Sequence, residues 1–325
     1  MKTYFQNGIM QEIQQYTDCI NSFCVQEIPD SIEKYVYKGD SIRDSLNYEL
    51  VELYDKFRDL LFPDTEKYYE QIDSVPIFVR EAGYNSDCSL SSEQLLELID
   101  IFKDTVPDLY KHLYLVDIQF LIATIQNLLD SMNYAFTNYY VEISKINVTD
   151  ILRSDADTTL MLNSYEARCL SSLVESYFTK AYSILDMLTK IEYEFEHKYD
   201  TFDSFKKTKS ANILWGDRKK LNIETQNTIF SRSNTVKLIE SLRNEVVHNG
   251  SIEENPRVFI RFENNQIAER FMLIPDHTDG LLVTSKSRKH FFSQENKANY
   301  VLPTIHFDYL NEVLSTIKYL NNRNL

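Results

Sequence analysis

Apolar side chains recur at steps of three and four residues over most of the chain, which is the spacing of amphipathic helices. One apolar stripe runs from Val116 to Met132, and another covers 306–322. The clearest stripe lies between Asn163 and Glu196 and comprises Leu170, Leu173, Val174, Tyr177, Ala181, Ile184, Leu185, Leu188 and Phe195. The pattern predicts a mainly α protein built as a helical bundle.

The first 150 residues are predicted to form an acidic, all-helical domain. Residues 5–27 and 31–62 have helical spacing with acidic outer faces, and the proline-containing stretch 62–76 interrupts them. Ser91 or Ser92 can cap a further helix, because serine oxygens accept hydrogen bonds from the first free backbone N–H groups. Pro107 is expected to break or kink that helix.

A shorter helix is predicted after residue 232. Ser233 or Asn234 can cap it, and Gly250 can end it, because glycine adopts the left-handed conformation that often closes a helix. Its predicted inward face consists of Val236, Ile239, Leu242 and Val246.

The period then changes from helical to extended. Residues 258–262, 268–273 and 281–284 are predicted to be short strands, and Asp279-Gly280 marks a tight turn between them. They form a small antiparallel β-meander insertion at about 256–290. The insertion belongs to a second domain, which spans 155–325.

Charge is unevenly distributed along the chain. Residues 1–200 hold 16 basic and 35 acidic side chains, a balance of −19, whereas 201–325 hold 18 basic and 14 acidic ones, a balance of +4. The net charge of −15 argues against a protein that coats nucleic acid. The basic part includes the loop 197–232, with the only tryptophan, Trp215, and leaves room for an RNA-facing patch.

Cysteine spacing and hydropathy indicate a cytoplasmic protein with no membrane span. The spacing of the cysteines fits neither a zinc site nor a disulfide framework, so reduced thiols are expected at Cys19, Cys24, Cys88 and Cys169. The N-terminus lacks the apolar core of a signal peptide. The most apolar stretch, 113–129, contains Asp117 and is expected to be a buried helix.

The stretch RNEVVHNG, residues 243–250, carries the clearest chemistry. Asn244 and His248 are four residues apart and share a helix face, and the long side chain of Arg243 can bend over the helix end. Histidine exchanges protons near neutral pH, and arginine holds two phosphate oxygens with a permanent charge. These residues are the minimum set for metal-free attack of a ribose 2′-hydroxyl on its own phosphodiester. An ordinary helix end with surface ion pairs from Arg243 to Glu240 or Glu245 is the competing interpretation.

The stretch LIESLRNEVVHNG, residues 238–250, resembles the motif helix of the HEPN superfamily, the helical domains of many prokaryotic RNases, toxins and phage-defence proteins. The stretch SYFTKAYSILDMLTKIEYEF, residues 176–195, is similar to the first long helix of that family. The resemblance extends over 163–325 at most. The long basic loop before the motif helix and the strands after it depart from the compact four-helix core of the family.

The resemblance implies a metal-independent endoribonuclease that acts as a toxin or in phage defence by abortive infection. His248 would be general base or acid, Arg243 would stabilise charge on the phosphate, and Asn244 would support them. One histidine cannot easily be both base and acid, and family members usually place two motifs across a dimer groove, so the resemblance also implies a homodimer. The acidic N-terminal region could bind a protein regulator. The alternatives are a non-catalytic HEPN-like module that binds RNA, nucleotide or protein, and a purely structural interaction protein.

Other candidate residues have weaker support. A second arginine–histidine match, Arg270 with His277, spans a predicted strand and is assigned to chance. Glu175 is expected to face solvent, Tyr177 is expected in the core, and Asp186 could point into the groove. The basic cluster 286–290, which includes His290, could contact an RNA backbone but is expected to be a solvated turn. No metalloprotease, Walker or nucleophile-elbow motif occurs, so neither a metal nor a cofactor is expected.

Overall fold

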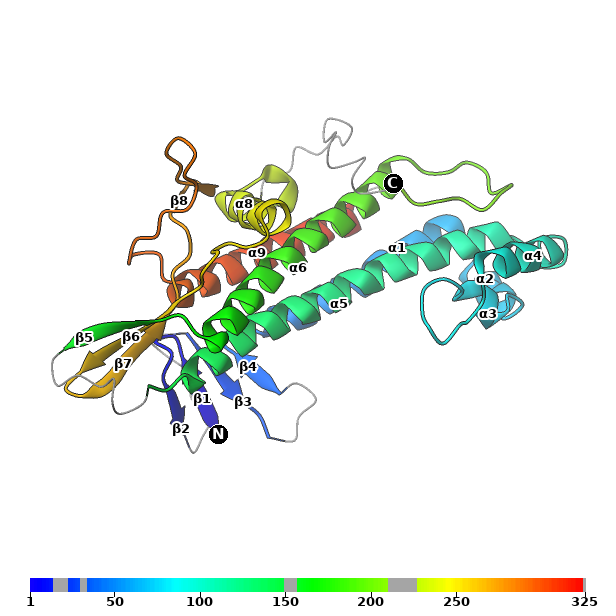
Figure 1. The fold of residues 1–325 in the computed structure, drawn as a ribbon. Helices are drawn as coiled ribbons and strands as arrows, with labels where there is room; N and C mark the ends of the chain where they lie inside the picture. The colour runs from blue at the N-terminus through cyan, green and yellow to red at the C-terminus, as the bar shows by residue number, and fades with distance from the viewer. Residues whose placement is uncertain (14–22, 30–33, 149–156, 210–226, 324–325) are drawn as a thin grey trace. The chain divides into compact units, whose positions relative to one another are not determined.

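The protein is mainly α-helical with small antiparallel sheets (Figure 1). The computed structural model describes residues 1–13, 23–29, 34–148, 157–209 and 227–323. Helices make up about 55% of the described residues. This agrees with the mainly α class predicted from the apolar period.

By its internal contacts the chain forms two compact units. Unit 1 comprises Met1–Ser45, Leu128–Ser183 and Glu224–Thr316. Unit 2 comprises Leu46–Asn127, Ile184–Ile223 and Ile317–Leu325. Each unit draws on residues from both sides of position 150, so the predicted cut between 1–150 and 155–325 does not separate them.

The N-terminal part of unit 1 is a four-stranded sheet, which corrects the prediction of an all-helical start. Its antiparallel strands follow the order β2-β1-β3-β4. They are β1 (Lys2–Phe5), β2 (Met10–Glu12), β3 (Cys24–Glu27) and β4 (Tyr35–Tyr37). The turn between β1 and β2 contains Gly8 at φ +73°, and a Cβ there would lie 2.6 Å from the carbonyl oxygen of Arg270. Pairing with distant backbone therefore overrides the local helical spacing.

A second sheet in unit 1 has the antiparallel order β5-β6-β7. Strands β6 (Val258–Glu263) and β7 (Gln266–Phe271) confirm two predicted strands. The predicted meander was incomplete, because β5 (Thr158–Leu162) comes from the stretch before the long helix and pairs with β6. Strands β8 (His277–Thr278) and β9 (Leu281–Leu282) form a separate hairpin. Its turn is Asp279-Gly280, with φ of 53° and 79°, as in a type I′ turn.

Four helices contribute residues to both units, namely α1 (Ser41–Leu61), α5 (Leu109–Lys145), α6 (Tyr165–Glu196) and α9 (Ala298–Asn322). Helix α9 begins eight residues earlier than predicted and contains Pro303. Proline has no N–H to donate to the carbonyl four residues before it. That carbonyl, of Asn299, accepts a hydrogen bond from the Tyr140 hydroxyl at 2.8 Å instead, which explains why the helix tolerates the proline.

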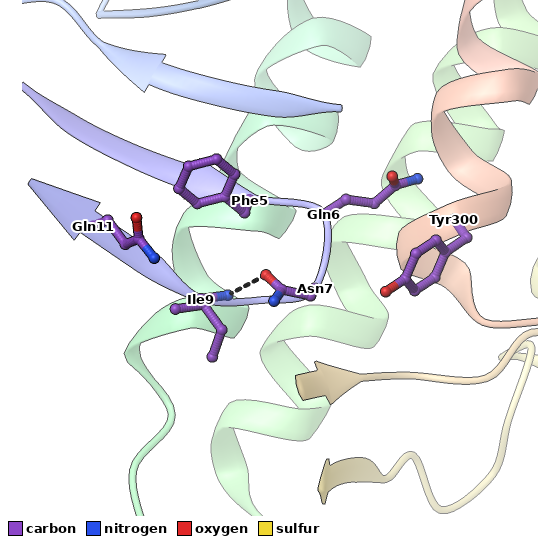
Figure 2. Close-up of a pocket in the computed structure, with 6 residues that line it drawn as sticks. All are labelled: Phe5, Gln6, Asn7, Ile9, Gln11 and Tyr300. Atoms are coloured by element: carbon purple, nitrogen blue, oxygen red, sulfur yellow. Dashed lines mark hydrogen bonds between the residues drawn. The ribbon is translucent and has the colours of Figure 1, made fainter. Parts of the chain in front are cut away.

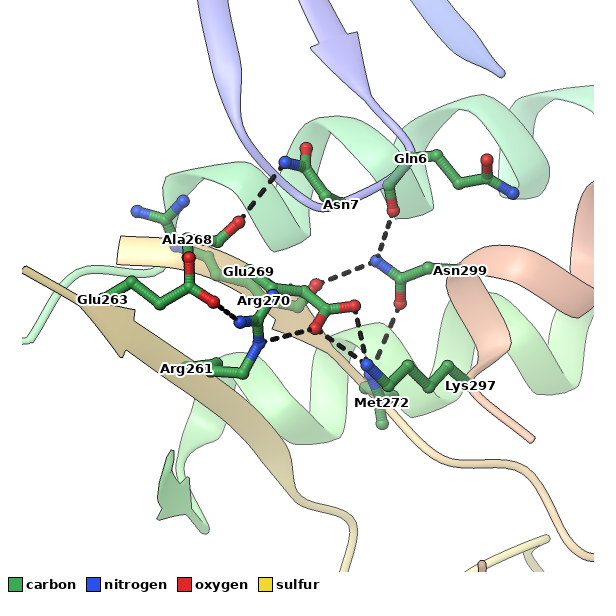
Figure 3. A network of polar contacts seen from close by, with 10 residues as sticks. All are labelled: Gln6, Asn7, Arg261, Glu263, Ala268, Glu269, Arg270, Met272, Lys297 and Asn299. Carbon is green, nitrogen blue, oxygen red and sulfur yellow. Dashed lines mark hydrogen bonds and ion pairs between the residues drawn. The ribbon is translucent and has the colours of Figure 1, made fainter. Parts of the chain in front are cut away.

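Asn299 is the centre of a polar network that joins the β1–β2 turn, β7 and α9 (Figure 3). Its buried amide donates to the carbonyls of Gln6 and Arg270, both at 2.9 Å. Its side-chain oxygen accepts from the Tyr139 hydroxyl at 2.7 Å and from the Met272 N–H at 3.4 Å. One side chain therefore satisfies four buried or half-buried polar groups from separate segments.

Two neighbouring charged residues of β7 are also buried in this network. Glu269 is paired with Lys297 at 2.8 Å and with Arg261 at 3.2 Å. Burial opposes ionisation of Glu269, but hydrogen bonds and charge from Lys297 and Arg261 outweigh it and hold its pKa below the usual value. The Arg270 guanidinium donates to the carbonyls of Ile146 at 2.6 Å and Gly8 at 2.9 Å. Arg270 therefore has a structural role, as expected of the second arginine–histidine match.

Unit 2 contains three short helices, α2 (Thr65–Ile72), α3 (Ile77–Arg80) and α4 (Ser92–Phe102). Ser91 caps α4 in a reciprocal capping box with Gln94, which confirms the predicted cap. Pro107 lies between α4 and α5, as predicted. A hydrophobic cluster holds these helices to α5 and consists of Val75, Val79, Ile99, Val106, Leu109 and Leu113.

Among the described helices, α5 alone is long and apolar enough to cross a membrane by length and composition. The most apolar window of α5 is 56% buried inside the protein, as in the core helix of a soluble protein. The expectation of reduced thiols is wrong at Cys24, which is disulfide-bonded. Cys88 and Cys169 are free and half-buried, and Cys19 lies outside the described residues.

Candidate functional site

The predicted motif lies on helix α8 (Asn234–Asn249) of unit 1. Ser233 caps the helix by accepting from the Val236 N–H at 3.1 Å, and Gly250 ends it at φ +88°. Val236, Ile239 and Leu242 are fully buried, which confirms most of the predicted inward face. The Ser233 cap, the end at Gly250 and the buried apolar face together determine which side of the last two turns of α8 is exposed.

The outward face of these two turns carries the motif. At about 100° per residue, Asn244 and His248 lie about 40° apart in the middle of that face, with Val247 beside them. Val247 and His248 are exposed, and Asn244 is half-buried. We call these three residues the α8 strip. Arg243 borders the strip on one side and Glu245 borders it on the other, by the same geometry.

Arg243 is held in place by an aromatic ring and by a neighbouring side-chain amide. Its guanidinium carbon lies 4.3 Å from the ring centre of Tyr182 on α6, and its Nη1 donates to the Asn244 side-chain oxygen at 3.1 Å. The acidic side chains expected to pair with it have other partners: Glu240 pairs with Arg232 at 2.8 Å, and Glu245 with His290 at 2.9 Å. No carboxylate of the described residues forms an ion pair with Arg243. Its charge therefore remains available for an anion.

His248 is exposed in the last turn of α8. The structure brings Arg243 and Asn244 into contact with each other. Within the described part of one chain, however, no hydrogen bond joins His248 to either of them.

The sequence interpretation missed a carboxylate–histidine pair beside the strip. Glu245 is largely buried, with an 11% exposed side chain, and accepts from His290 Nε2 and from the Asn249 amide. His290 was expected in a solvated turn, yet it is half-buried against α8. The signal in the sequence was only that Glu245 precedes His248 by three residues, which makes them neighbours on a helix.

The β8–β9 hairpin packs along α8 and leads to His290. A Cβ on Gly280 would lie 2.2 Å from the Asn234 carbonyl oxygen, and the Gly280 carbonyl accepts from the Ser241 hydroxyl at 3.1 Å. The chain then turns tightly through Lys286, at φ 56°. The turn places Lys286, Arg288 and Lys289 in solvent, so the predicted basic cluster is exposed except for His290.

The remaining candidates have structural roles or lie elsewhere. Glu175 was expected in solvent, but it is half-buried and accepts from the Ile252 N–H at 3.1 Å, just after α8 ends. Tyr177 is in the core, as predicted, and Asp186 is half-buried on α6. Residues 210–226 of the predicted basic loop are not described, so Trp215 and the basic residues 218–220 lie outside the described residues.

Two other histidines belong to the cores of their units. His306 stacks on Phe136 at 4.0 Å and bonds to the Tyr37 hydroxyl at 2.7 Å, and burial lowers its pKa to about 3. His112 stacks on Phe62 at 4.4 Å, and burial lowers its pKa to about 4. Both rings are therefore neutral near pH 7 and out of reach of a large substrate.

A pocket of about 360 Å³ lies beside the β1–β2 turn and is lined by Phe5, Gln6, Asn7, Ile9, Gln11 and Tyr300 (Figure 2). The Asn7 side chain accepts from the Ile9 N–H at 3.3 Å, so it stabilises the turn. Burial, and then the nearby Glu269, raise the pKa of Tyr300 to about 12. Tyr300 therefore stays protonated at neutral pH, and the lining offers amides and rings but no base for proton transfer.

No family model, curated protein or solved structure matches this chain. The described residues contain no group of three or more histidine, cysteine or acidic side chains that could hold a metal ion. The case for a functional site therefore depends on the residues and geometry at the end of α8.

Proposed function

We propose that the protein is a metal-independent endoribonuclease of the HEPN type that acts as a toxin or as a phage-defence effector by abortive infection. The observation that supports this most directly is the arrangement of Arg243. Its charge is not neutralised by a carboxylate of the described residues, it is fixed on Tyr182, and it borders an exposed strip that contains His248. The competing interpretation, surface ion pairs from Arg243 to Glu240 or Glu245, is not met, because these carboxylates pair with Arg232 and His290.

The proposed reaction is attack of a ribose 2′-hydroxyl on the adjacent phosphorus. His248 removes the 2′-hydroxyl proton, and Arg243 binds the phosphate oxygens whose charge grows in the transition state. Asn244 keeps the Arg243 guanidinium in position through its side-chain oxygen. The P–O5′ bond breaks and leaves a 2′,3′-cyclic phosphate and a 5′-hydroxyl.

We further propose that two copies of the chain act together in the cytoplasm. Since Arg243 and His248 do not meet within the described part of one chain, a second copy would bring the histidine of one α8 toward the arginine of the other. The helical bundle that such family members use would be formed by the helices within 163–325, namely α6, α8 and α9. The acidic N-terminal region, residues 1–150, would serve as the surface for a protein regulator, because its excess of carboxylates favours a basic partner.

Purified protein is expected to cleave single-stranded RNA in excess EDTA, because the proposed site uses no metal. End-group analysis should find 2′,3′-cyclic phosphates and 5′-hydroxyls. The matched control is DNA of the same sequence, which lacks the nucleophile and should remain intact. Cleavage that requires a divalent metal, or that leaves 5′-phosphates, would refute the proposal.

The exposed turn with Lys286, Arg288 and Lys289 also supports a second function, RNA binding without cleavage. Each replacement by alanine should weaken RNA binding at low salt and reduce the slope of log K against log salt by about 1, because one phosphate contact is lost. Lys318→Ala, on an exposed position of α9, is the control and should leave the slope unchanged. Unchanged slopes for all three variants would show that this turn does not contact the backbone.

A further inference from the structure

The Glu245 carboxylate holds the imidazole ring of His290 in place. Glu245 lies at the border of the buried face of α8, and its carboxylate accepts from His290 Nε2 at 2.9 Å and from the Asn249 amide. A buried carboxylate that bonds one ring nitrogen fixes the orientation of the ring. Among the described residues, none forms a hydrogen bond with His290 Nδ1. That nitrogen can therefore serve a substrate.

The pair lies next to the proposed site. Glu245 and His248 are three residues apart on α8, which places their Cβ atoms about 5–6 Å from each other. The β8–β9 hairpin packs on the same side of the helix through Ser241 and Gly280, so the chain that carries His290 is anchored there at two points. His248 thus belongs to the exposed strip that Arg243 borders on one side and the Glu245–His290 pair borders on the other.

We propose that His290 is the general acid of the ribonuclease reaction, held in position by Glu245. This inference rests on the proposed function. His248 accepts the proton of the 2′-hydroxyl as the new 2′-O–P bond forms. His290 Nδ1 donates a proton to the 5′-oxygen as the P–O5′ bond breaks, so no net charge is created. The second histidine that the reaction needs then comes from the same chain, and dimerisation is not required to supply it.

A substrate with sulfur in place of the bridging 5′-oxygen tests the role of His290. A thiolate leaves without protonation, because a thiol is far more acidic than an alcohol. His290→Gln is expected to cut normal RNA about 10²–10⁴-fold more slowly than wild type. It should cut the 5′-thio substrate within about tenfold of wild type, since general acid catalysis typically contributes at least 10²-fold and is not needed there. His248→Ala should be impaired on both substrates, and His277→Gln, the same exchange on the preceding hairpin, should be normal on both.

Each other outcome overturns a specific statement. Normal cleavage of RNA by His290→Gln, or an equal loss on both substrates, refutes the general acid role and leaves the proposed function intact. If the 5′-thio substrate restores cleavage by His248→Ala and not by His290→Gln, the two histidines have the opposite roles and the assignment is refuted. If wild type cuts neither substrate, the proposed function fails and the inference fails with it.

Glu245→Gln tests the positioning role and guards against a folding defect in His290→Gln. The amide keeps the shape of the side chain but carries no negative charge, so its hydrogen bond to His290 Nε2 is weaker and the ring is held less firmly. Cleavage of normal RNA should therefore slow more than cleavage of the 5′-thio substrate, which does not need the general acid. An equal loss of rate on both substrates would indicate that Glu245 has only a structural role.

Discussion

His248→Ala is expected to fold like wild type and to cleave RNA about 10²–10⁴-fold more slowly, because the 2′-hydroxyl loses its general base. The side chain is exposed, so its removal should change the free energy of unfolding by no more than about 0.5 kcal/mol. Single-turnover cleavage and a urea titration measure both quantities. Expression in cells should be toxic for wild type and harmless for the variant.

His197→Ala is a suitable control for this experiment, because His197 is an exposed histidine at the end of α6 in unit 2 and should be dispensable. Arg243→Ala should lose a similar factor through the phosphate contact. Mixing Arg243→Ala with His248→Ala then tests the proposed composite site: a shared site regains activity in the mixture, whereas a site within one chain does not. A His248→Ala enzyme as active as wild type would end the ribonuclease proposal.

Asn299→Ala is expected to lower the free energy of unfolding by about 3–5 kcal/mol. The substitution leaves the carbonyls of Gln6 and Arg270, the Tyr139 hydroxyl and the Met272 N–H without their partner. Each buried polar group left unsatisfied costs about 1–3 kcal/mol, and relaxation and water entry recover part of the sum. Urea unfolding followed by circular dichroism measures the effect as a lower midpoint.

Asn311→Ala provides the matched control, because Asn311 lies on the same helix but is exposed and bonds only to the Phe307 carbonyl within the described chain. It should change stability by no more than about 0.5 kcal/mol. Equal effects of the two variants would show that the α9 asparagines act through helix propensity and that the buried network contributes little.

The helices could be predicted from the sequence because their signals are local. Ser91, Ser233 and Gly250 each act within four residues of their own position, and all three end or begin a helix as predicted. The apolar stripes of α5 and α6 are likewise repeated within one segment. Local hydrogen bonds and local periodicity are enough to fix such elements.

The sheets could be predicted only in part, because pairing depends on distant backbone. Strand β1 pairs with β3 some twenty residues away, and β5 pairs with β6 across the whole of α6 and α8. Neither β1 nor β5 is long enough to show a period of its own. The hairpin β8–β9 was found because its Asp279-Gly280 turn is a local signal.

The candidate site could likewise be predicted only in part from the sequence. The placement of Asn244 and His248 on an outward helix face could be predicted from their spacing and from the apolar residues around them. The stacking of Arg243 on Tyr182 could not, since it joins two helices, and neither could the His290–Glu245 bond across 45 residues. Residues brought together by tertiary packing leave no trace in local spacing.

The bond from Asn299 to the Gln6 carbonyl joins residues 293 positions apart and has a consequence for biosynthesis. The β1–β2 turn can be locked only after the ribosome has synthesised the chain as far as Asn299. At about 5–20 residues per second, about 15–60 s pass between the synthesis of the N-terminal strands and the synthesis of Asn299. We therefore expect nascent chains that stop before α9 to lack a stable unit 1 and, with it, the activity proposed for this protein.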